Sequence, residues 1–203
     1  MFLDIGSKHK DMYTLNEYNE ISSKYGQYSS WAIWNETNPK DTTIIDSCYQ
    51  ELNTRYVFIG LNISRLLNDF NWSNFHDNTH ARKLNYACNK TTLRGSYLTD
   101  LFKDIPEPNS IKLSESLTND IIESNILFFK TEMEYVQINT NTVFILLGDK
   151  VQKFYNQYFK EHFNNKVINY RHYSSRGTDK EWVVGLWNKI SIEYSFEDIV
   201  SKP

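Results

Sequence analysis

The side chains best suited to chemistry occur at or just after the ends of four short apolar runs. They combine an amide, two carboxylates, an imidazole, an aromatic ring, hydroxyls and cations: Asn62, Ser64, Phe75, Asp100, Lys103, Asp149, His172, Ser174, Ser175 and Arg176. An amide carbonyl can hold a water, carboxylates and imidazoles exchange protons, and a ring stacks on a flat ligand. A single Asn or Asp after a strand usually forms a turn. Their occurrence together therefore indicates a ligand site.

The four apolar runs read as strands that would position these side chains. They are "RYVFIG" (55–60), "SYLTDLF" (96–102), "NTVFILLG" (141–148) and "KVINYRH" (166–172). The first and third are nearly continuous in Val, Ile, Phe and Leu, which is typical of parallel strands covered on both faces. Gly60 and Gly148 end these two runs abruptly, so the strand ends can form one rim.

Helical patterns separate the strands and complete the predicted fold. Residues 116–136, 149–163 and 179–190 carry apolar side chains at helical spacing, and Ser116 or Thr118 is suited to cap the first of them. The alternation predicts a three-layer αβα domain with a central, mostly parallel four-stranded sheet. Ligands bind such sheets outside the carboxyl ends of the strands. Asp149 is assigned to helix capping, and "SSWAIWN" (29–35) to a buried helix or strand.

Length and composition bound the remaining possibilities. The 203 residues predict a single domain, with core motifs at 55–176, an N-terminal extension at 1–54 and a C-terminal helix at 179–191. Cys48 and Cys88 are too few for a disulfide framework or a four-cysteine metal site. No apolar run reaches the roughly 18 residues that a membrane span needs, and the start lacks a signal peptide, so we expect a cytoplasmic protein.

The charges are unevenly distributed although the net charge is only -3. Five Lys or Arg residues oppose one acid in 80–103, and five oppose two acids in 160–180, whereas 104–134 is acidic. This pattern is compatible with a basic face for nucleic acid, or with ordinary solvated surfaces.

The order of the motifs resembles the uracil-DNA glycosylase superfamily. "GLNIS" is similar to the first motif of that family, Gly-x-Asn/Asp/Glu-Pro, with Asn62 at the water-activating position. Phe75 matches the ring that stacks on the extruded base, and "YLTDLFK" places Asp100 where the family has a base-reading asparagine. "RHYSSRG" resembles the last motif, His-Pro-Ser, through His172. The resemblance spans roughly residues 56–176.

The resemblance implies a monofunctional DNA glycosylase that flips a pyrimidine nucleotide, hydrolyses its N-glycosidic bond and leaves an abasic site, without metal or cofactor. It implies that Asn62 holds the water and His172 supports the leaving base. The remaining roles are base binding by Phe75, Asp100 and Ser64, and DNA binding by Ser174, Ser175, Arg176, Lys103 and Arg171. The basic stretches at 82–94 and 160–180 would flank the DNA groove. Lys103 is the lysine to watch for a lyase reaction.

Three departures from the family pattern bear on the base that is removed. Ile63 and Tyr173 stand where the family has proline, so the turn geometry differs. An ionised Asp100 only accepts hydrogen bonds and suits the amino group of cytosine, and the small Ser64 leaves room at C5. These two residues favour a 5-modified cytosine, as in phage DNA, and hence an antiphage role. A protonated Asp100 would instead donate to O4 and preserve uracil reading in base-excision repair.

Other interpretations stay open. A catalytically silent relative could bind DNA or a protein inhibitor, because Asn62 is a poor base and Ile63 replaces proline. "NFHDNTH", with His76, Asp77 and His80, is a weak metal pattern that reads more simply as a loop. No P-loop or dinucleotide fingerprint is present in the sequence.

Overall fold

The computed structural model describes residues 12–63, 70–76, 81–103 and 105–200. Its centre is a five-stranded sheet in the order β1-β3-β2-β4-β5. The strands are β1 (Ser30–Trp31), β2 (Asn53–Asn62), β3 (Ser96–Phe102), β4 (Val143–Leu147) and β5 (Lys166–Tyr170). The four predicted strands are confirmed with small shifts at their ends.

The sheet has one strand more than predicted. β2, β3, β4 and β5 run parallel, whereas β1 pairs antiparallel with β3 at the edge, with Ser30 opposite Leu98 and Trp31 opposite Tyr97. The predicted four-stranded sheet is therefore wrong in strand number, because the segment 29–35 adds a two-residue strand. If the four parallel strands are numbered 1 to 4 along the chain, their order across the sheet is 2-1-3-4. The order reverses between β2 and β4, which lie side by side.

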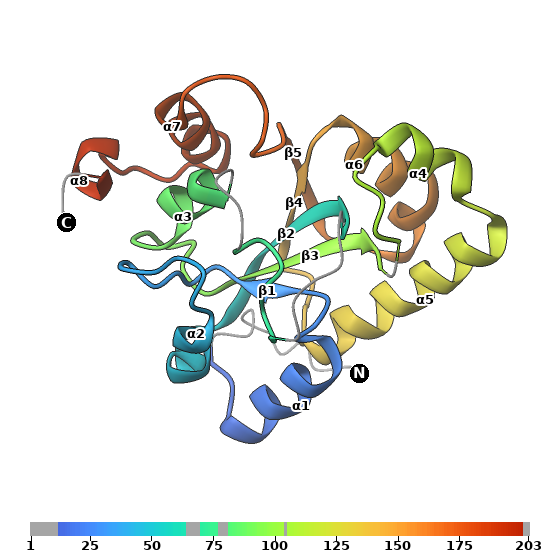
Figure 1. Ribbon diagram of the computed structural model, residues 1–203, viewed down its shortest axis with the longest axis horizontal. Helices are drawn as coiled ribbons and strands as arrows, with labels where there is room; N and C mark the ends of the chain where they lie inside the picture. The colour runs from blue at the N-terminus through green and yellow to red at the C-terminus, as the bar shows by residue number, and fades with distance from the viewer. Residues whose placement is uncertain (1–11, 64–69, 77–80, 104, 201–203) are drawn as a thin grey trace, which may run out of the picture.

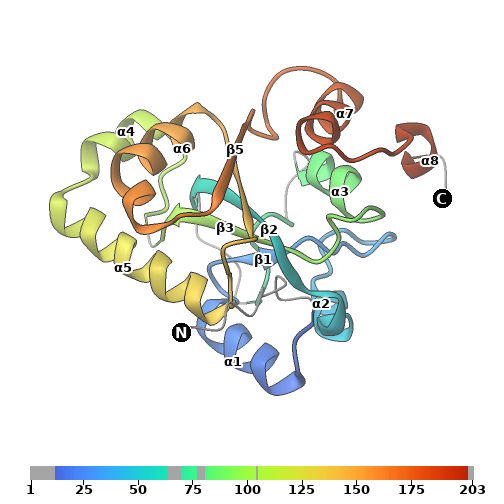
Figure 2. The same cartoon turned by 180° about the vertical axis from the view of Figure 1, so that it is seen from behind.

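Helices cover both faces of the sheet (Figure 1). Figure 2 shows from behind that α3, α7 and α8 lie to one side of the sheet and that α1, α5 and α6 lie to the other. The helices are α1 (Leu15–Tyr25), α2 (Thr43–Ser47), α3 (Arg82–Cys88), α4 (Ser110–Ser116), α5 (Asn119–Tyr135), α6 (Asp149–Phe154), α7 (Asp179–Ile190) and α8 (Phe196–Val200). The arrangement is a three-layer α/β fold.

Two hydrophobic cores lie against the two faces of the sheet. Val57 and Ile59 of β2 join the core formed with α1 and α5, while Phe58 between them joins the core formed with α3 and α7. This alternation follows from the strand period of two. Because both faces are buried, the strand interiors read as continuous apolar runs.

Of the two helix caps that the sequence predicts, one is confirmed and one is wrong. Thr118 caps α5 through Ile121 N–H, and Thr178 forms a capping box with Glu181 at α7. Asp149 is instead the first residue of α6, and the cap is Gly148 at φ 107° without a side-chain bond, so the predicted Asp149 cap is wrong. The carboxylate still lies in the first turn, where the helix dipole favours negative charge.

The predicted helix 149–163 divides into three kinds of turn. α6 ends at Phe154, a π-helical segment follows (Tyr155–Phe159), and a 3₁₀ turn (Lys160–His162) leads to β5. Within the described part of the chain, no helix has the length and apolar character needed to span a bilayer.

Candidate functional site

The site is built around Gly60, near the end of β2. Gly60 lies directly opposite Asp100 of β3 in the parallel register. A Cβ at position 60 would come within 2.1 Å of Asp100 Oδ1 and 3.4 Å of Phe75 Cζ. Glycine is required here because the carboxylate and the ring both approach the backbone where any side chain would begin. Asp100 and Phe75, predicted as base-binding residues, thus meet at one point.

Asp100 has a buried carboxyl group, and one of its two oxygens accepts a hydrogen bond. Its residue is 4% exposed, and Oδ2 accepts a 2.9 Å hydrogen bond from Asn74 Nδ2. No described residue donates a hydrogen bond to Oδ1. Desolvation by burial raises the pKa of Asp100 to about 6, while Lys103 and the Asn74 hydrogen bond act in the opposite direction. The group can therefore change its charge near neutral pH.

Phe75 is held in a strained backbone conformation. Its φ is +68°, and Trp72 in the same loop has φ +66°, in the left-handed region that bulky residues rarely adopt. Phe75 is buried, and its ring centroid lies 6.1 Å from that of Tyr173 in an edge contact. Such strain persists only where surrounding contacts fix the loop, and it is common at functional sites.

His172 reaches the same rim from β5 through its neighbour Tyr173. The two rings stack with centroids 4.1 Å apart, and a Cβ on Gly148 would lie 3.3 Å from His172 Cβ. His172 Nδ1 accepts from Ser174 N–H at 3.1 Å and lies 2.7 Å from Ser174 Oγ. Because a backbone N–H can only donate, Nδ1 carries no proton. The neutral ring therefore has its proton on Nε2.

The loop after His172 is fastened from α3. The buried Lys83 donates from Nζ to Ser175 O at 2.8 Å and to Gly177 O at 3.2 Å. Ser175 Oγ is buried without a hydrogen bond from the described residues, whereas Ser174 and Arg176 are exposed. Arg171 is partly buried, and its guanidinium lies near Gly177. Only part of the predicted DNA-binding set thus faces solvent.

Asn62 anchors a neighbouring loop. Its Nδ2 donates to Ile105 O at 2.8 Å, to Glu107 O at 2.9 Å and to Ile63 O at 3.3 Å. These contacts fix the amide orientation and leave Oδ1 without a hydrogen bond from the described residues. Asn62 is partly buried at the same edge of the sheet as His172, although no direct contact joins the two. Ser64 lies outside the described residues.

Lys103 is not available to DNA, which corrects the prediction that it binds there. Its side chain is 2% exposed and pairs with Glu132, which is fully buried on α5, at 3.1 Å. Thr99 Oγ1 accepts a further hydrogen bond from the ammonium, and Tyr97 joins the same group by donating to Glu132. The pair lies behind Asp100 and forms part of its electrostatic surroundings. The same burial removes Lys103 as a lyase candidate in this conformation.

The first basic stretch does not form one face, contrary to the prediction that 82–94 flanks the groove. Arg82 pairs with Asp179, Lys90 with Glu36 and Arg94 with Glu51. Lys90 and Arg94 lie toward the amino-terminal end of the sheet, away from Asp100. Of this stretch, the buried Lys83 stays at the site, beside the loop that contains Ser175 and Gly177, and the other stretch contributes Arg171 and Arg176.

His76 is a core residue. It is 3% exposed, its Nε2 lies 3.2 Å from Trp31 O, and its ring stacks on Trp34 at 4.7 Å. Desolvation lowers its pKa to about 4. Asp77 and His80, its partners in the weak metal pattern, lie outside the described residues. Because the ring is enclosed, His76 has a structural role in the core.

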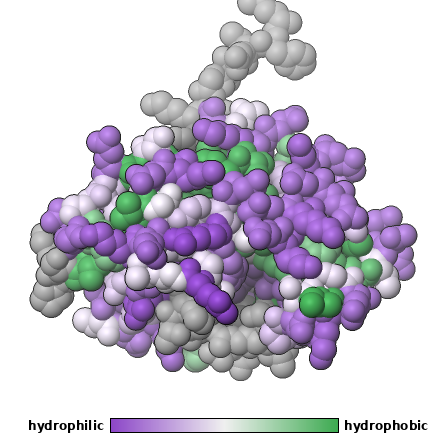
Figure 3. All heavy atoms as spheres, turned by 90° about the horizontal axis from the view of Figure 1, so that it is seen from above, coloured by the Kyte–Doolittle hydropathy of each residue, from purple (hydrophilic) through white to green (hydrophobic). Residues whose placement is uncertain are grey.

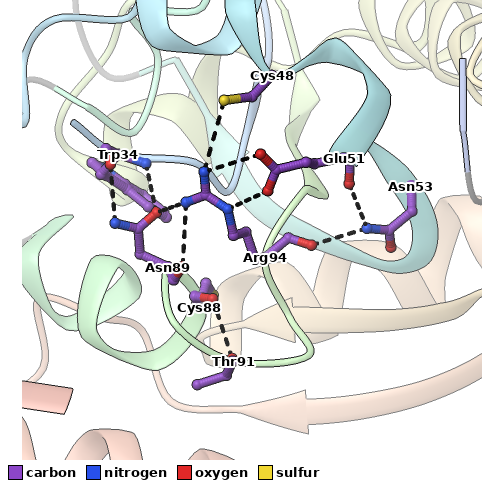
Figure 4. A network of polar contacts seen from close by, with 8 residues as sticks. All are labelled: Trp34, Cys48, Glu51, Asn53, Cys88, Asn89, Thr91 and Arg94. Atoms are coloured by element: carbon purple, nitrogen blue, oxygen red, sulfur yellow. Dashed lines mark hydrogen bonds and ion pairs between the residues drawn. The ribbon is translucent and has the colours of Figure 1, made fainter. Parts of the chain in front are cut away.

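The opposite end of the sheet carries a different polar cluster, the Arg94 network (Figure 4). Arg94 donates from Nε to Glu51 Oε2 at 2.5 Å and also contacts Asn89 and Cys48. Asn89 in turn bonds both backbone groups of Trp34. Asn53, at the start of β2, donates to Glu51 O and Arg94 O. These groups satisfy one another, and their role is to join the strand starts.

Sequence reasoning missed three residues of the site: Asn74, Tyr173 as a ring partner, and Lys83. The only signal for Asn74 in the sequence was its place directly before Phe75, which was predicted to bind the base. Lys83 gave no signal, since lysine is rarely buried. No family model, curated protein or solved structure matches the chain.

Proposed function

We propose that the protein is a DNA glycosylase that flips a pyrimidine nucleotide and hydrolyses its N-glycosidic bond. The observation that carries the proposal is the meeting of Phe75 and Asp100 at Gly60, with Tyr173 linking Phe75 to His172 on the same rim. A ring for stacking, a carboxyl for an edge and an imidazole for a leaving group match the parts of a flipped base. The close relation to the uracil-DNA glycosylase superfamily is part of this proposal.

Asn62 is the proposed water-holding residue. Its Oδ1 accepts a hydrogen bond from a water placed below the sugar, while its Nδ2 is fixed by Ile105 O and Glu107 O. The water oxygen bonds to C1′, the C1′–N1 bond breaks with its electron pair going to the base, and the water proton is released. An amide positions the water but takes up little of its proton, so the rate depends on geometry.

His172 is the proposed support for the departing base. With Nδ1 bonded by Ser174, the neutral ring offers Nε2–H to the pyrimidine O2, where negative charge develops. A neutral donor stabilises the base anion without protonating it. The departing anion then takes up a proton from solvent.

Asp100 is the proposed reader of position 4. Ionised, it accepts from the amino group of a cytosine; protonated, it donates to O4 of uracil. A pKa of about 6 leaves the ionised form dominant at neutral pH, which puts a 5-modified cytosine ahead of uracil. A role in defence against phages with modified DNA follows from the cytosine assignment. Arg176, exposed four residues after His172, is the proposed wedge in the gap left by the nucleotide.

The face seen in Figure 3 is mainly hydrophilic, and its hydrophobic atoms form only scattered patches.

A second candidate, a catalytically silent DNA-binding relative, is favoured by the three hydrogen bonds of Asn62 Nδ2. An asparagine retained to hold the loop at 105–107 would need no catalytic role. This candidate predicts DNA binding without base release, and a protein inhibitor is a further partner that it would allow.

Single-turnover incubation with duplexes separates the two functions. The substrates carry uracil, a thymine mismatch, 5-hydroxymethylcytosine or its glucosylated form at one position, and released base is measured by mass spectrometry. Release from one of them is the expected result. Binding to all duplexes without any release would favour the silent relative, and neither binding nor release would contradict both.

Asn62→Ala tests the catalytic assignment. We expect loss of release with duplex binding retained, because the water loses its acceptor. The matched control is Asn165→Ala, since Asn165 Nδ2 also donates to two backbone carbonyls, of Asn139 and Thr142, but at the other end of the sheet. Unchanged release in Asn62→Ala would contradict the assignment.

A further inference from the structure

Asn74 has an amide whose two N–H groups are both used. Nδ2 donates to Asp100 Oδ2 at 2.9 Å and to Tyr28 O at 3.0 Å, and the residue is 9% exposed. Tyr28 O is a backbone carbonyl and can only accept. The orientation of the amide is therefore determined by Tyr28, and Asn74 can act on Asp100 only as a donor.

The donor orientation makes the two oxygens of Asp100 unequal. Oδ2 must accept from Asn74 in either charge state, so a proton on Asp100 resides on Oδ1. Oδ1 is the oxygen that lies against Gly60, where Phe75 Cζ also approaches. No described residue donates to Oδ1, and it is the atom left to meet a ligand.

We propose that Asn74 is a positioning residue for base specificity, which dedicates Oδ1 of Asp100 to position 4 of the base and reserves Oδ2 for itself. This inference rests on the proposed glycosylase function. With a single oxygen presented, the base edge meets either one acceptor or one donor, and never both together. The substrate class is then set by the charge of Asp100: an exocyclic amino group when it is ionised, and a keto oxygen when it is protonated.

Three groups act on the charge of Asp100 from the elements around it. Burial, which has the largest effect, and Glu132 on α5 raise its pKa, whereas Lys103, directly after the same strand, and Asn74 in the loop lower it. Removing the Asn74 donor therefore raises the pKa of Asp100. More of the protonated form is then present at pH 7, which weakens recognition of an amino group.

Asn74→Asp and Asn74→Ala test the inference. Asn74→Asp keeps the shape but replaces the donor by an acceptor, while Asn74→Ala removes it. Single-turnover release is measured from pH 5 to 9 with 5-hydroxymethylcytosine and with uracil in the same duplex. In both variants we expect the ratio of cytosine-type to uracil release at pH 7 to fall by about tenfold, the worth of a hydrogen bond to a charged group. The midpoint of cytosine-type release should also move to higher pH.

The matched control is Asn71→Ala. Asn71 lies in the same loop and anchors it through its amide, which donates to Ser22 Oγ at 2.9 Å, but it does not contact Asp100. We expect the control to change the rates for both bases equally and to leave the midpoint unchanged. The same equal loss in the two Asn74 variants would show a merely structural role and overturn the inference.

The titration of the Asp100 carboxyl carbon, followed by NMR in wild type and in Asn74→Ala, separates the inference from the proposed function. If the wild-type protein releases no base, the proposed function fails by itself. A midpoint that moves upward in the variant supports the contact that Asn74 makes. An unmoved midpoint overturns the inference whether or not the protein is an enzyme.

Discussion

The two ends of the sheet are built on different principles. At the amino-terminal end, the Arg94 network joins Glu51, Asn89 and Asn53 in mutual hydrogen bonds, and its ion pair is partly exposed. At the carboxyl-terminal end, Asp100 is buried with one oxygen to which no residue in the described part of the chain donates, and Phe75 is strained. The first end stabilises the fold, while the second holds groups in states that the fold alone does not favour. The difference favours the carboxyl-terminal end as the place of the proposed ligand site.

The largest expected effect is on the buried pair at the carboxyl-terminal end. Lys103→Met leaves Glu132 charged and unpaired in the core, so we expect a loss of about 3–5 kcal/mol in the free energy of unfolding. Urea denaturation measures it. The double variant with Glu132→Leu removes both charges and should recover most of the loss. A single variant as stable as wild type would show that the pair is not buried in solution.

Asp100→Asn should make the protein more stable at neutral pH. The folded-state pKa of about 6 lies above the ordinary value of 3.8, so the folded state binds the proton more tightly than the unfolded state does. Stability is therefore full below pH 3.8 and falls as the pH rises to 6. The variant avoids this loss and should gain up to about 3 kcal/mol at pH 7. Denaturation at pH 4 and 7 measures the gain, which should nearly vanish at pH 4.

The same substitution sharpens the functional side of the comparison. Asp100→Asn presents an amide to the base edge and should shift release from cytosine-type bases toward uracil, measured in the same duplexes. A gain in stability with no shift in base preference would mean that the buried Asp100 carboxyl has a role other than reading the base.

Gly60→Ala tests the crowding at the site. The added Cβ would overlap Asp100 Oδ1, so we expect about 2 kcal/mol of destabilisation and loss of base release. Thermal unfolding and the release assay measure the two effects. The control is Gly185→Ala on α7, where the new Cβ meets only the end of the Tyr170 side chain. If Gly60→Ala released base at the wild-type rate, the site would lie elsewhere.

Arg94→Met has the smallest expected effect and tests the amino-terminal end of the sheet. It removes an ion pair that is partly exposed and a hydrogen bond to Asn89, so we expect a loss of about 1–2 kcal/mol in the free energy of unfolding. Base release by the folded protein should be unchanged. Release that fell with no change in stability would contradict the division of roles between the two ends.

The strands and long helices could be predicted because their apolar periodicity reflects burial directly. β3 and α7 have the bounds that the sequence indicated. The edge strand β1 was ambiguous, since a strand of only two residues, Ser30 and Trp31, shows no period. The break of the helix after Phe154 was also invisible, because a π-helical turn keeps a helix-like apolar pattern.

The sequence indicated where the candidate site lies, but it did not indicate which side chains contact one another there. Strand ends indicated where Asp100 and His172 would lie, yet the Asn74 bond depends on a loop conformation with two left-handed residues. Lys103 was misassigned because a lysine after a strand is ordinarily exposed. A usable signal was Glu132, which follows Phe129 by three residues and so falls on the apolar stripe of α5. A carboxylate on such a stripe needs a buried cation.

The left-handed backbone conformation of Phe75 affects the entropy and the rate of ligand binding. The Phe75 ring is packed beside Gly60 in the free protein, so this part of the proposed site is already in place before a ligand arrives. Ordering this ring then costs little conformational entropy on binding, and the association rate should approach that expected for a rigid receptor.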